Sequence, residues 1–133
     1  MNKVFLVTAF CFFSLQMVAQ SNASQSATER GRNIYEGNCL ACHQADGSGV
    51  PNLTPPLIKT SFVTGDKAKL INIVLKGLRD VEVNGESYDN PMPAFEFLSD
   101  KEIADVLTYV RSNFGNESNP IKAEEVTSVR KSQ

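Results

Sequence analysis

A long irregular segment is the feature that most constrains how this chain can fold. Residues 39–64 show neither helical nor strand periodicity, and several glycines and prolines interrupt them. These are Gly47, Gly49, Pro51, Pro55 and Pro56. Irregular segments of more than about 15 residues are uncommon inside a small domain. In a chain of 133 residues, we therefore expect something other than chain–chain packing to order this segment.

The segment begins with the most specific motif of the sequence, Cys39-Leu40-Ala41-Cys42-His43. In such a C-x-x-C-H pattern, two thiolates can add to the two vinyl groups of one haem while the adjacent imidazole reaches the iron. The motif therefore predicts one haem c, covalently bonded to Cys39 and Cys42, with His43 as an iron ligand. A flat apolar haem would also order the irregular segment. The candidates for its pocket are Leu57, Phe62, Leu75, Phe95 and Leu98.

Three other uses of the two cysteines fit the sequence less well. A zinc site needs four ligands, whereas the chain after residue 20 offers two Cys and one His. A thiol–disulfide oxidoreductase would place its C-x-x-C near a strand–helix–strand pattern, and no strand pattern precedes Cys39. An inert disulfide would leave His43 without a role.

The first 20 residues have the layout of a secretory signal peptide. One lysine precedes an almost entirely apolar run over residues 4–18, which is short for a membrane span of about 20 apolar residues. With cleavage near Ala19, we expect an exported, periplasmic protein that reaches the membrane only through a partner or an uncleaved signal. Residues 21–26 are polar and small, as in a flexible tether.

The net charge excludes one class of partner. The formal charge is −2 at pH 7, and removal of residues 1–19, where Lys3 is the only charged residue, makes it −3. Nucleic acids and anionic membrane surfaces attract proteins through basic patches. We therefore expect no nucleic-acid partner.

Helical patterns account for most of the remaining chain. Three segments carry an apolar stripe, and the first and last begin with a Ser followed three residues later by Glu, which is a capping box. They cover residues 27–38, 66–78 and 99–113. An Asn-Gly pair between residues 81–83 and 86–88 predicts a small hairpin. Residues 116–133 form a C-terminal tail that can add a short helix.

The sequence resembles the small class I monohaem cytochromes c over residues 31–114. The resemblance rests on Gly31 and Tyr35, the C-x-x-C-H motif, Pro55-Pro56-Leu57, Met92-Pro93, and Val106 and Tyr109, in that order. It implies that residues 27–115 form a mainly α, cytochrome c-like helical fold around one haem. The hairpin would precede the loop that carries Met92, called the methionine loop below. It also implies that the Gly31 side of the first helix crosses the last helix, with Val106 and Tyr109 packed against it.

Met92 is the candidate for the second axial ligand. His43 is the only histidine, and the other two methionines lie in the predicted signal peptide. Met92 stands between two prolines, which favour a rigid extended loop, and its thioether is the remaining soft ligand. A methionine beside prolines can also simply fill a gap in a core.

The resemblance also suggests how His43 is oriented. A ligating imidazole usually donates its other N–H to a fixed acceptor, and in the cytochrome family a proline carbonyl accepts it. The family's Pro-x-Leu pattern selects Pro55, two residues before Leu57, and Pro56 is the alternative.

These residues together predict an electron carrier and no enzyme. An iron with both axial positions filled cannot readily activate a substrate, so one-electron exchange remains. We expect a monomer whose partners are redox proteins: a dehydrogenase, a respiratory complex, or a terminal oxidase or reductase. Two alternatives stay open, a five-coordinate haem protein that binds gas or peroxide, and a haem-free thiol–disulfide protein.

Overall fold

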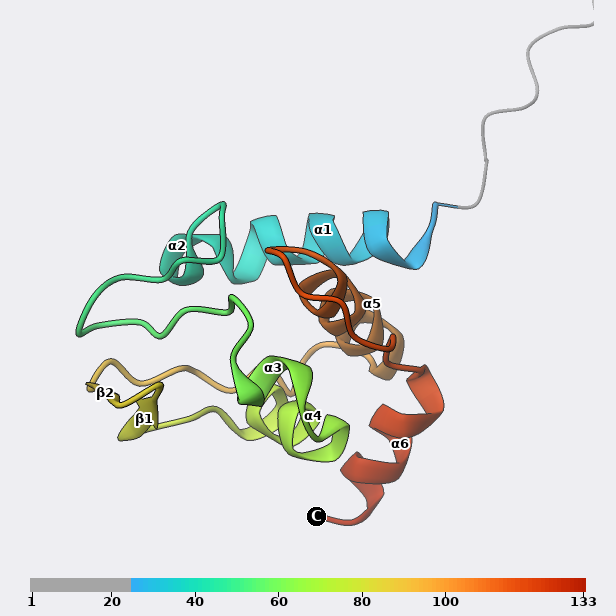
Figure 1. Cartoon of the computed structure of the whole chain (residues 1–133). Helices are drawn as coiled ribbons and strands as arrows, with labels where there is room; N and C mark the ends of the chain where they lie inside the picture. The colour runs from blue at the N-terminus through green and yellow to red at the C-terminus, as the bar shows by residue number, and fades with distance from the viewer. Residues whose placement is uncertain (1–24) are drawn as a thin grey trace, which may run out of the picture.

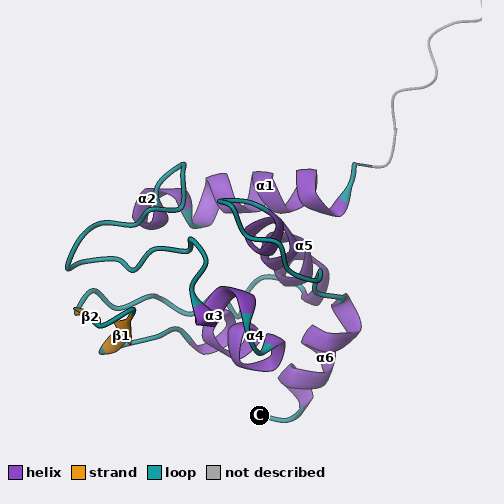
Figure 2. Ribbon diagram, in the orientation of Figure 1, coloured by secondary structure: helices purple, strands orange, loops and turns teal. Residues whose placement is uncertain are grey.

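Helices dominate the computed structural model, which describes residues 25–133 (Figures 1 and 2). The elements are α1 (Ala27–Asn38), α2 (Leu40–His43), α3 (Ser61–Thr64), α4 (Lys67–Lys76), β1 (Val81–Val83), β2 (Glu86–Tyr88), α5 (Asp100–Ser112) and α6 (Ala123–Lys131). The predicted mainly α fold with one hairpin is confirmed. The predicted signal peptide, residues 1–20, lies outside the described residues, as do residues 21–24 of the predicted tether.

The two capping boxes form as the sequence predicts. The Ser26 hydroxyl accepts the Glu29 N–H, and the Glu29 carboxylate accepts the Ser26 N–H at 2.8 Å. Ser99 and Glu102 make the same reciprocal pair at the start of α5. Because each box satisfies donors that the first helical turn leaves free, it fixes where the helix begins.

Two predicted boundaries are wrong, whereas the short helix expected in the tail is present. The helix expected over 66–78 is shorter, because Asp66 caps it from outside and Gly77, with φ at 80°, ends it. The segment 39–64 is not irregular throughout, since α2 and α3 lie at its two ends. One-turn helices are too short to show a periodic pattern. The short helix of the tail is the nine-residue α6, which buries Val126 completely against the core.

Helices α1 and α5 pack against each other (Figure 1), and Gly31 lies in their contact. A Cβ atom added to Gly31 would lie 2.0 Å from the Asp105 carbonyl oxygen and 2.8 Å from the Tyr109 Cβ. The backbones can come this close only because Gly31 has no side chain. The predicted crossing of these two helices is confirmed.

A partly buried ion pair lies next to this crossing, with a buried carboxylate and more exposed cations. Arg30 donates to both carboxylate oxygens of Asp105, from Nε at 2.6 Å and from Nη2 at 2.9 Å. Lys101 donates to the same carboxylate at 2.6 Å. Burial alone would raise the pKa of Asp105, but the hydrogen bonds from Arg30 and Lys101 outweigh it and hold that pKa below its ordinary value.

The mutation Asp105→Asn should therefore destabilise the protein in a pH-dependent way. A carboxyl whose pKa is lower in the folded state stabilises the fold above its unfolded pKa of about 4. That contribution is lost as the pH falls through the folded pKa. We expect a loss of about 1–2 kcal/mol in the free energy of unfolding at pH 7, shrinking below pH 4, in urea titrations over a pH series.

Glu36→Gln is the matched control, because it also removes one carboxylate that pairs with an arginine of α1. Arg32 and Glu36 form an exposed pair at 2.8 Å, and such pairs add little to stability because solvent screens them. Equal losses of unfolding free energy in the two variants at pH 7 would show that the Arg30–Asp105 pair adds no more stability than the exposed Arg32–Glu36 pair.

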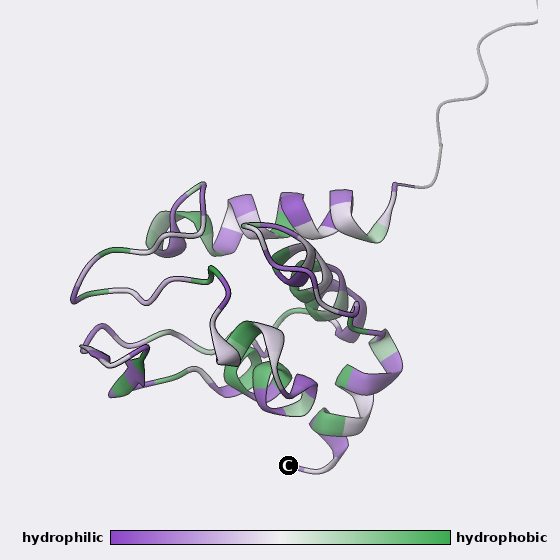
Figure 3. Ribbon diagram, in the orientation of Figure 1, coloured by the Kyte–Doolittle hydropathy of each residue, from purple (hydrophilic) through white to green (hydrophobic). Residues whose placement is uncertain are grey.

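Helix α6 closes the other side of the core by packing on α4 and α5. An ion pair joins it to each helix, Lys67 with Glu125 at 3.0 Å and Arg130 with Asp100 at 2.7 Å. Figure 3 shows that α4 is largely hydrophobic, whereas α1 is largely hydrophilic. Within residues 25–133, no helix combines the length and the apolar character needed to cross a bilayer.

Candidate functional site

The turn between α1 and α2 places the two cysteines and the histidine on one helical turn. Cys39 ends α1 and directly precedes α2, and the His43 N–H bonds to the Cys39 carbonyl at 2.9 Å. Both thiols are free, with Cys39 partly buried and Cys42 exposed. Burial, together with the neighbouring Cys42, raises the pKa of the Cys39 thiol to about 11. Reactive dithiols have lowered thiol pKa values, so this shift does not suit a thiol–disulfide enzyme.

His43 is buried, with 9% of its surface exposed, and one ring nitrogen is already engaged. Its Nδ1 lies 3.2 Å from the carbonyl oxygen of Pro55, the first proline of the pair. Nδ1 must donate to this oxygen, so the lone pair of Nε2 is free to bind a metal. Burial lowers the pKa of His43, and the Pro55 hydrogen bond opposes that shift only in part. The imidazole is therefore neutral at pH 7, as metal ligation requires.

The loop after α2 folds back onto His43. The Gly49 N–H bonds to the His43 carbonyl at 3.1 Å, and the Leu57 N–H bonds to the Gly47 carbonyl at 2.8 Å. Gly49 has φ at 67°, and a Cβ there would lie 2.2 Å from the Thr54 carbonyl oxygen. Backbone bonds to α2 and across the loop thus bring Pro55 to the histidine.

A cluster of aromatic side chains packs near the end of α2, and one of them bonds to the backbone just after it. The Tyr35 hydroxyl donates to the Gln44 carbonyl at 2.7 Å, next to His43 in the chain. The Tyr35 ring packs against Tyr109 and Phe114, with centroids 5.4 and 5.3 Å apart. Sequence reasoning identified Tyr35 and Tyr109 as helix-crossing residues but missed the Tyr35 hydrogen bond and Phe114. No sequence pattern marks a bond to a carbonyl nine residues away.

A two-residue bridge fixes the backbone of Met92. Its N–H donates to the Leu78 carbonyl at 2.9 Å, and the Leu78 N–H donates to the Met92 carbonyl at 3.1 Å. The Phe95 N–H bonds to the Val74 carbonyl at 2.9 Å. The methionine loop is therefore tied to α4 and to the residues just after it by hydrogen bonds on both sides of Pro93.

The predicted pocket residues fall into three groups. Leu75 and Leu98 are buried in the core, and Leu57 and Phe95 are partly buried against it. Phe62 instead lies beneath the Lys69 ammonium, 4.5 Å from the ring centroid, because a partly exposed ring gains from a nearby cation. A place for Phe62 in the haem pocket stays a prediction.

The donor set fits a haem. Cys39, Leu57, Met92 and Phe95 all pack partly buried against the same hydrophobic core as α4 and α5. The chain thus offers free thiols, a neutral imidazole with one free nitrogen, and a thioether, together with an apolar surface for the ring. Among residues 25–133, no group of three or more His, Cys, Asp or Glu side chains could hold a metal ion alone.

Comparison with known proteins identifies this arrangement. The family model of cytochrome c matches residues 28–114. The chain belongs to the cytochrome c family. It is therefore an electron-transfer protein that carries covalently attached haem c, and its function is that of a carrier and not of an enzyme.

Two kinds of relative resemble this cytochrome c. Cytochrome c-552 of Thermus thermophilus is 36% identical over 110 residues, which cover 75% of this chain and 83% of the relative. The gluconate 2-dehydrogenase cytochrome c subunit of Pantoea cypripedii is 34% identical over 110 residues, covering 80% of this chain and 25% of the subunit. The cytochrome c subunit of the alcohol dehydrogenase (quinone) of Gluconobacter oxydans (strain 621H) is 35% identical over 103 residues, covering 75% and 22%. The chain thus spans about a quarter of each dehydrogenase subunit.

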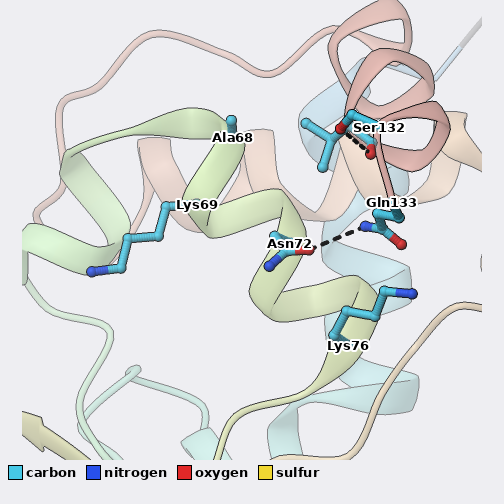
Figure 4. A pocket seen from close by; sticks show the side chains of 7 residues that line it. Ala68, Lys69, Asn72, Lys76, Ser132 and Gln133 are labelled. Carbon is cyan, nitrogen blue, oxygen red and sulfur yellow. Dashed lines mark hydrogen bonds between the residues drawn. The ribbon is translucent and has the colours of Figure 1, made fainter.

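A surface hollow elsewhere on this cytochrome c is separate from these residues. It lies between α4 and the end of α6, where the Gln133 amide donates to the Asn72 side chain at 3.1 Å (Figure 4). Its lining includes Lys69 and Lys76. None of its residues comes from α2, the following loop or the methionine loop.

Proposed function

We propose that Cys39 and Cys42 attach the haem, and that His43 and Met92 are its two axial ligands. The haem-binding domain would be residues 27–115, followed by a tail that contributes α6. In this assignment the cytochrome is a one-electron carrier with a six-coordinate iron. The bound haem supplies the one-electron Fe(II)/Fe(III) couple, whose potential thioether ligation raises.

The hydrogen bond between His43 and Pro55 is the observation that carries this proposal. It holds the single histidine of the chain in one tautomer, with Nε2 free beside two unpaired thiols. A second-sphere acceptor of this kind orients a ligating imidazole and raises its basicity. Because Leu57 is tied to Gly47, the acceptor is held in place by the loop itself.

The methionine assignment can be tested by the optical spectrum of Met92→Ala. We expect the parent protein to show a low-spin, six-coordinate haem with a sulfur–iron charge-transfer band. The band should disappear in the variant, because no other thioether remains in the chain after the predicted cleavage. Phe97→Ala is the control, since Phe97 lies in the same loop and its side chain is exposed; that variant should keep the band.

A five-coordinate haem is the competing function. It would bind carbon monoxide rapidly in the reduced parent protein, and it would leave the spectrum of Met92→Ala unchanged. The two-sided bridge at Leu78 favours the six-coordinate assignment, because it holds the methionine backbone at a fixed place as a weak ligand requires.

We also propose that the protein is exported and accepts electrons from a dehydrogenase. The signal-like pattern of residues 1–20 supports export, and relatives that are cytochrome subunits of dehydrogenases support this kind of partner. A respiratory complex is the alternative donor, and a terminal oxidase or reductase would be the acceptor. The mass of the periplasmic protein, expected to lack residues 1–19, tests the export step.

A further inference from the structure

A buried amide links the C-terminal tail to the loop that faces His43. Asn116 follows α5 and lies outside the part of the chain that matches the family model. Only 3% of its surface is exposed. Its Oδ1 accepts the Lys59 N–H at 2.7 Å, and its Nδ2 donates to the carbonyls of Leu57 at 3.0 Å and Val110 at 2.8 Å.

The residues that Asn116 holds, Leu57 and Lys59, lie two and four positions after Pro55, whose carbonyl accepts the His43 hydrogen bond. Pro55 and Pro56 have no backbone N–H, so neither can tie this part of the loop by donating a hydrogen bond. On the N-terminal side, Thr54 is tied to Val50 by two backbone hydrogen bonds. On the C-terminal side, the nearest anchors are at Leu57 and Lys59. Asn116 supplies two of them, and the Gly47 carbonyl supplies the third.

Lys59 has a backbone that needs such support. Its φ is 51°, in the left-handed region that residues other than glycine seldom adopt. The Asn116 oxygen accepts the N–H of this same residue. The amide thus stabilises an unfavourable turn, and this turn sets the direction in which the chain leaves Pro55 and Leu57.

We propose that Asn116 is a positioning residue for the axial histidine. It holds residues 57–59 so that the Pro55 carbonyl stays within hydrogen-bond distance of His43 Nδ1. This inference rests on the proposed function, because it assigns Asn116 a role only if His43 ligates the iron. Val110 connects the same amide to α5. The short chain segment 55–57 then joins the His43–Pro55 hydrogen bond to the bonds that Asn116 makes.

The test compares the rate at which the His43 Nδ1–H exchanges with solvent in Asn116→Ala and in the parent protein. The rate is measured by NMR on the reduced holoprotein. Losing the anchor frees the loop to swing away from the imidazole, and local opening of this kind exposes the proton without global unfolding. We expect exchange to be about tenfold faster than the measured loss of global stability accounts for, which corresponds to roughly one hydrogen bond.

Thr108→Val is the matched control. Thr108 is also buried, and its hydroxyl also bonds the tail to α5, accepting the Ile121 N–H at 3.1 Å and donating to the Ile121 carbonyl at 3.2 Å. No hydrogen bond joins its side chain to residues 55–59. In this variant, the exchange rate of the His43 Nδ1–H should change only by the amount that its change in global stability accounts for. The same corrected exchange rate in both variants would overturn the proposal.

Asn116→Ser provides the same comparison if the alanine variant does not fold, because serine keeps one donor and one acceptor. A smaller excess of exchange is expected, and none would count against the proposal. Failure of the proposed function looks different. In that case the parent protein itself lacks the six-coordinate spectrum, whereas failure of the Asn116 role leaves that spectrum intact.

Discussion

Replacement of Gly31 by alanine is expected to lower the free energy of unfolding by about 3 kcal/mol or more. The new methyl group would lie 2.0 Å from the Asp105 carbonyl oxygen, which is backbone in the middle of α5 and cannot rotate away. Overpacking of this kind typically costs about 1–3 kcal/mol and occasionally more, and here the clash involves main chain. It exceeds the roughly 1 kcal/mol that alanine gains over glycine inside a helix.

Gly37→Ala separates the clash from the effect of helix propensity. Gly37 lies in the same helix, and a Cβ added there meets no atom within 4 Å. This variant should be as stable as the parent or slightly more stable in guanidinium unfolding followed by circular dichroism. If Gly31→Ala unfolds at the same denaturant concentration as Gly37→Ala, the close helix crossing does not exist in solution.

Removal of both thiols, in Cys39→Ala/Cys42→Ala, is expected to abolish covalent haem. Thioether bonds survive denaturation, so a gel stained for haem reports them directly after expression with a cytochrome maturation system. The double variant should give no stained band. It should also fold less stably, because the apolar surface shared by Leu57, Met92 and Phe95 would have lost the ring expected to cover it.

Met92→Ala is the control for this experiment, since it removes a proposed iron ligand but neither thiol. It should stain as strongly as the parent chain. Stain that persists in the double variant would place the attachment elsewhere, and absence of stain in the parent would favour the haem-free alternative.

The elements that could be predicted were those that local chemistry determines. Both capping boxes are readable because Ser and Glu three residues apart satisfy each other within a single turn. The hairpin is readable from its Asn-Gly turn, where φ is 56° at Asn84 and 85° at Gly85. The motif at Cys39–His43 is readable because haem attachment fixes the spacing of its three reactive groups.

The features that could not be predicted depend on contacts between distant parts of the chain. Asn116 bonds to Lys59 and Leu57, which lie 57 and 59 positions earlier in the sequence. An isolated Asn after a helix has no pattern that reveals these bonds. The position of Phe62 beneath Lys69 depends in the same way on how α3 meets α4, which no local pattern reveals.

The crossing of α1 and α5 has a consequence for the order of folding. Its central contact joins Gly31 to Asp105, and the Arg30–Asp105 pair beside it spans 75 positions of the chain. Contacts of such long range form late, because a large loop must close first. Until α5 is in place, the only helix that α1 contacts is the one-turn α2 beside it, and Cys39, Cys42 and His43 remain on an open chain. Haem attachment enzymes that need access to both thiols would thus meet their substrate before the fold closes around it.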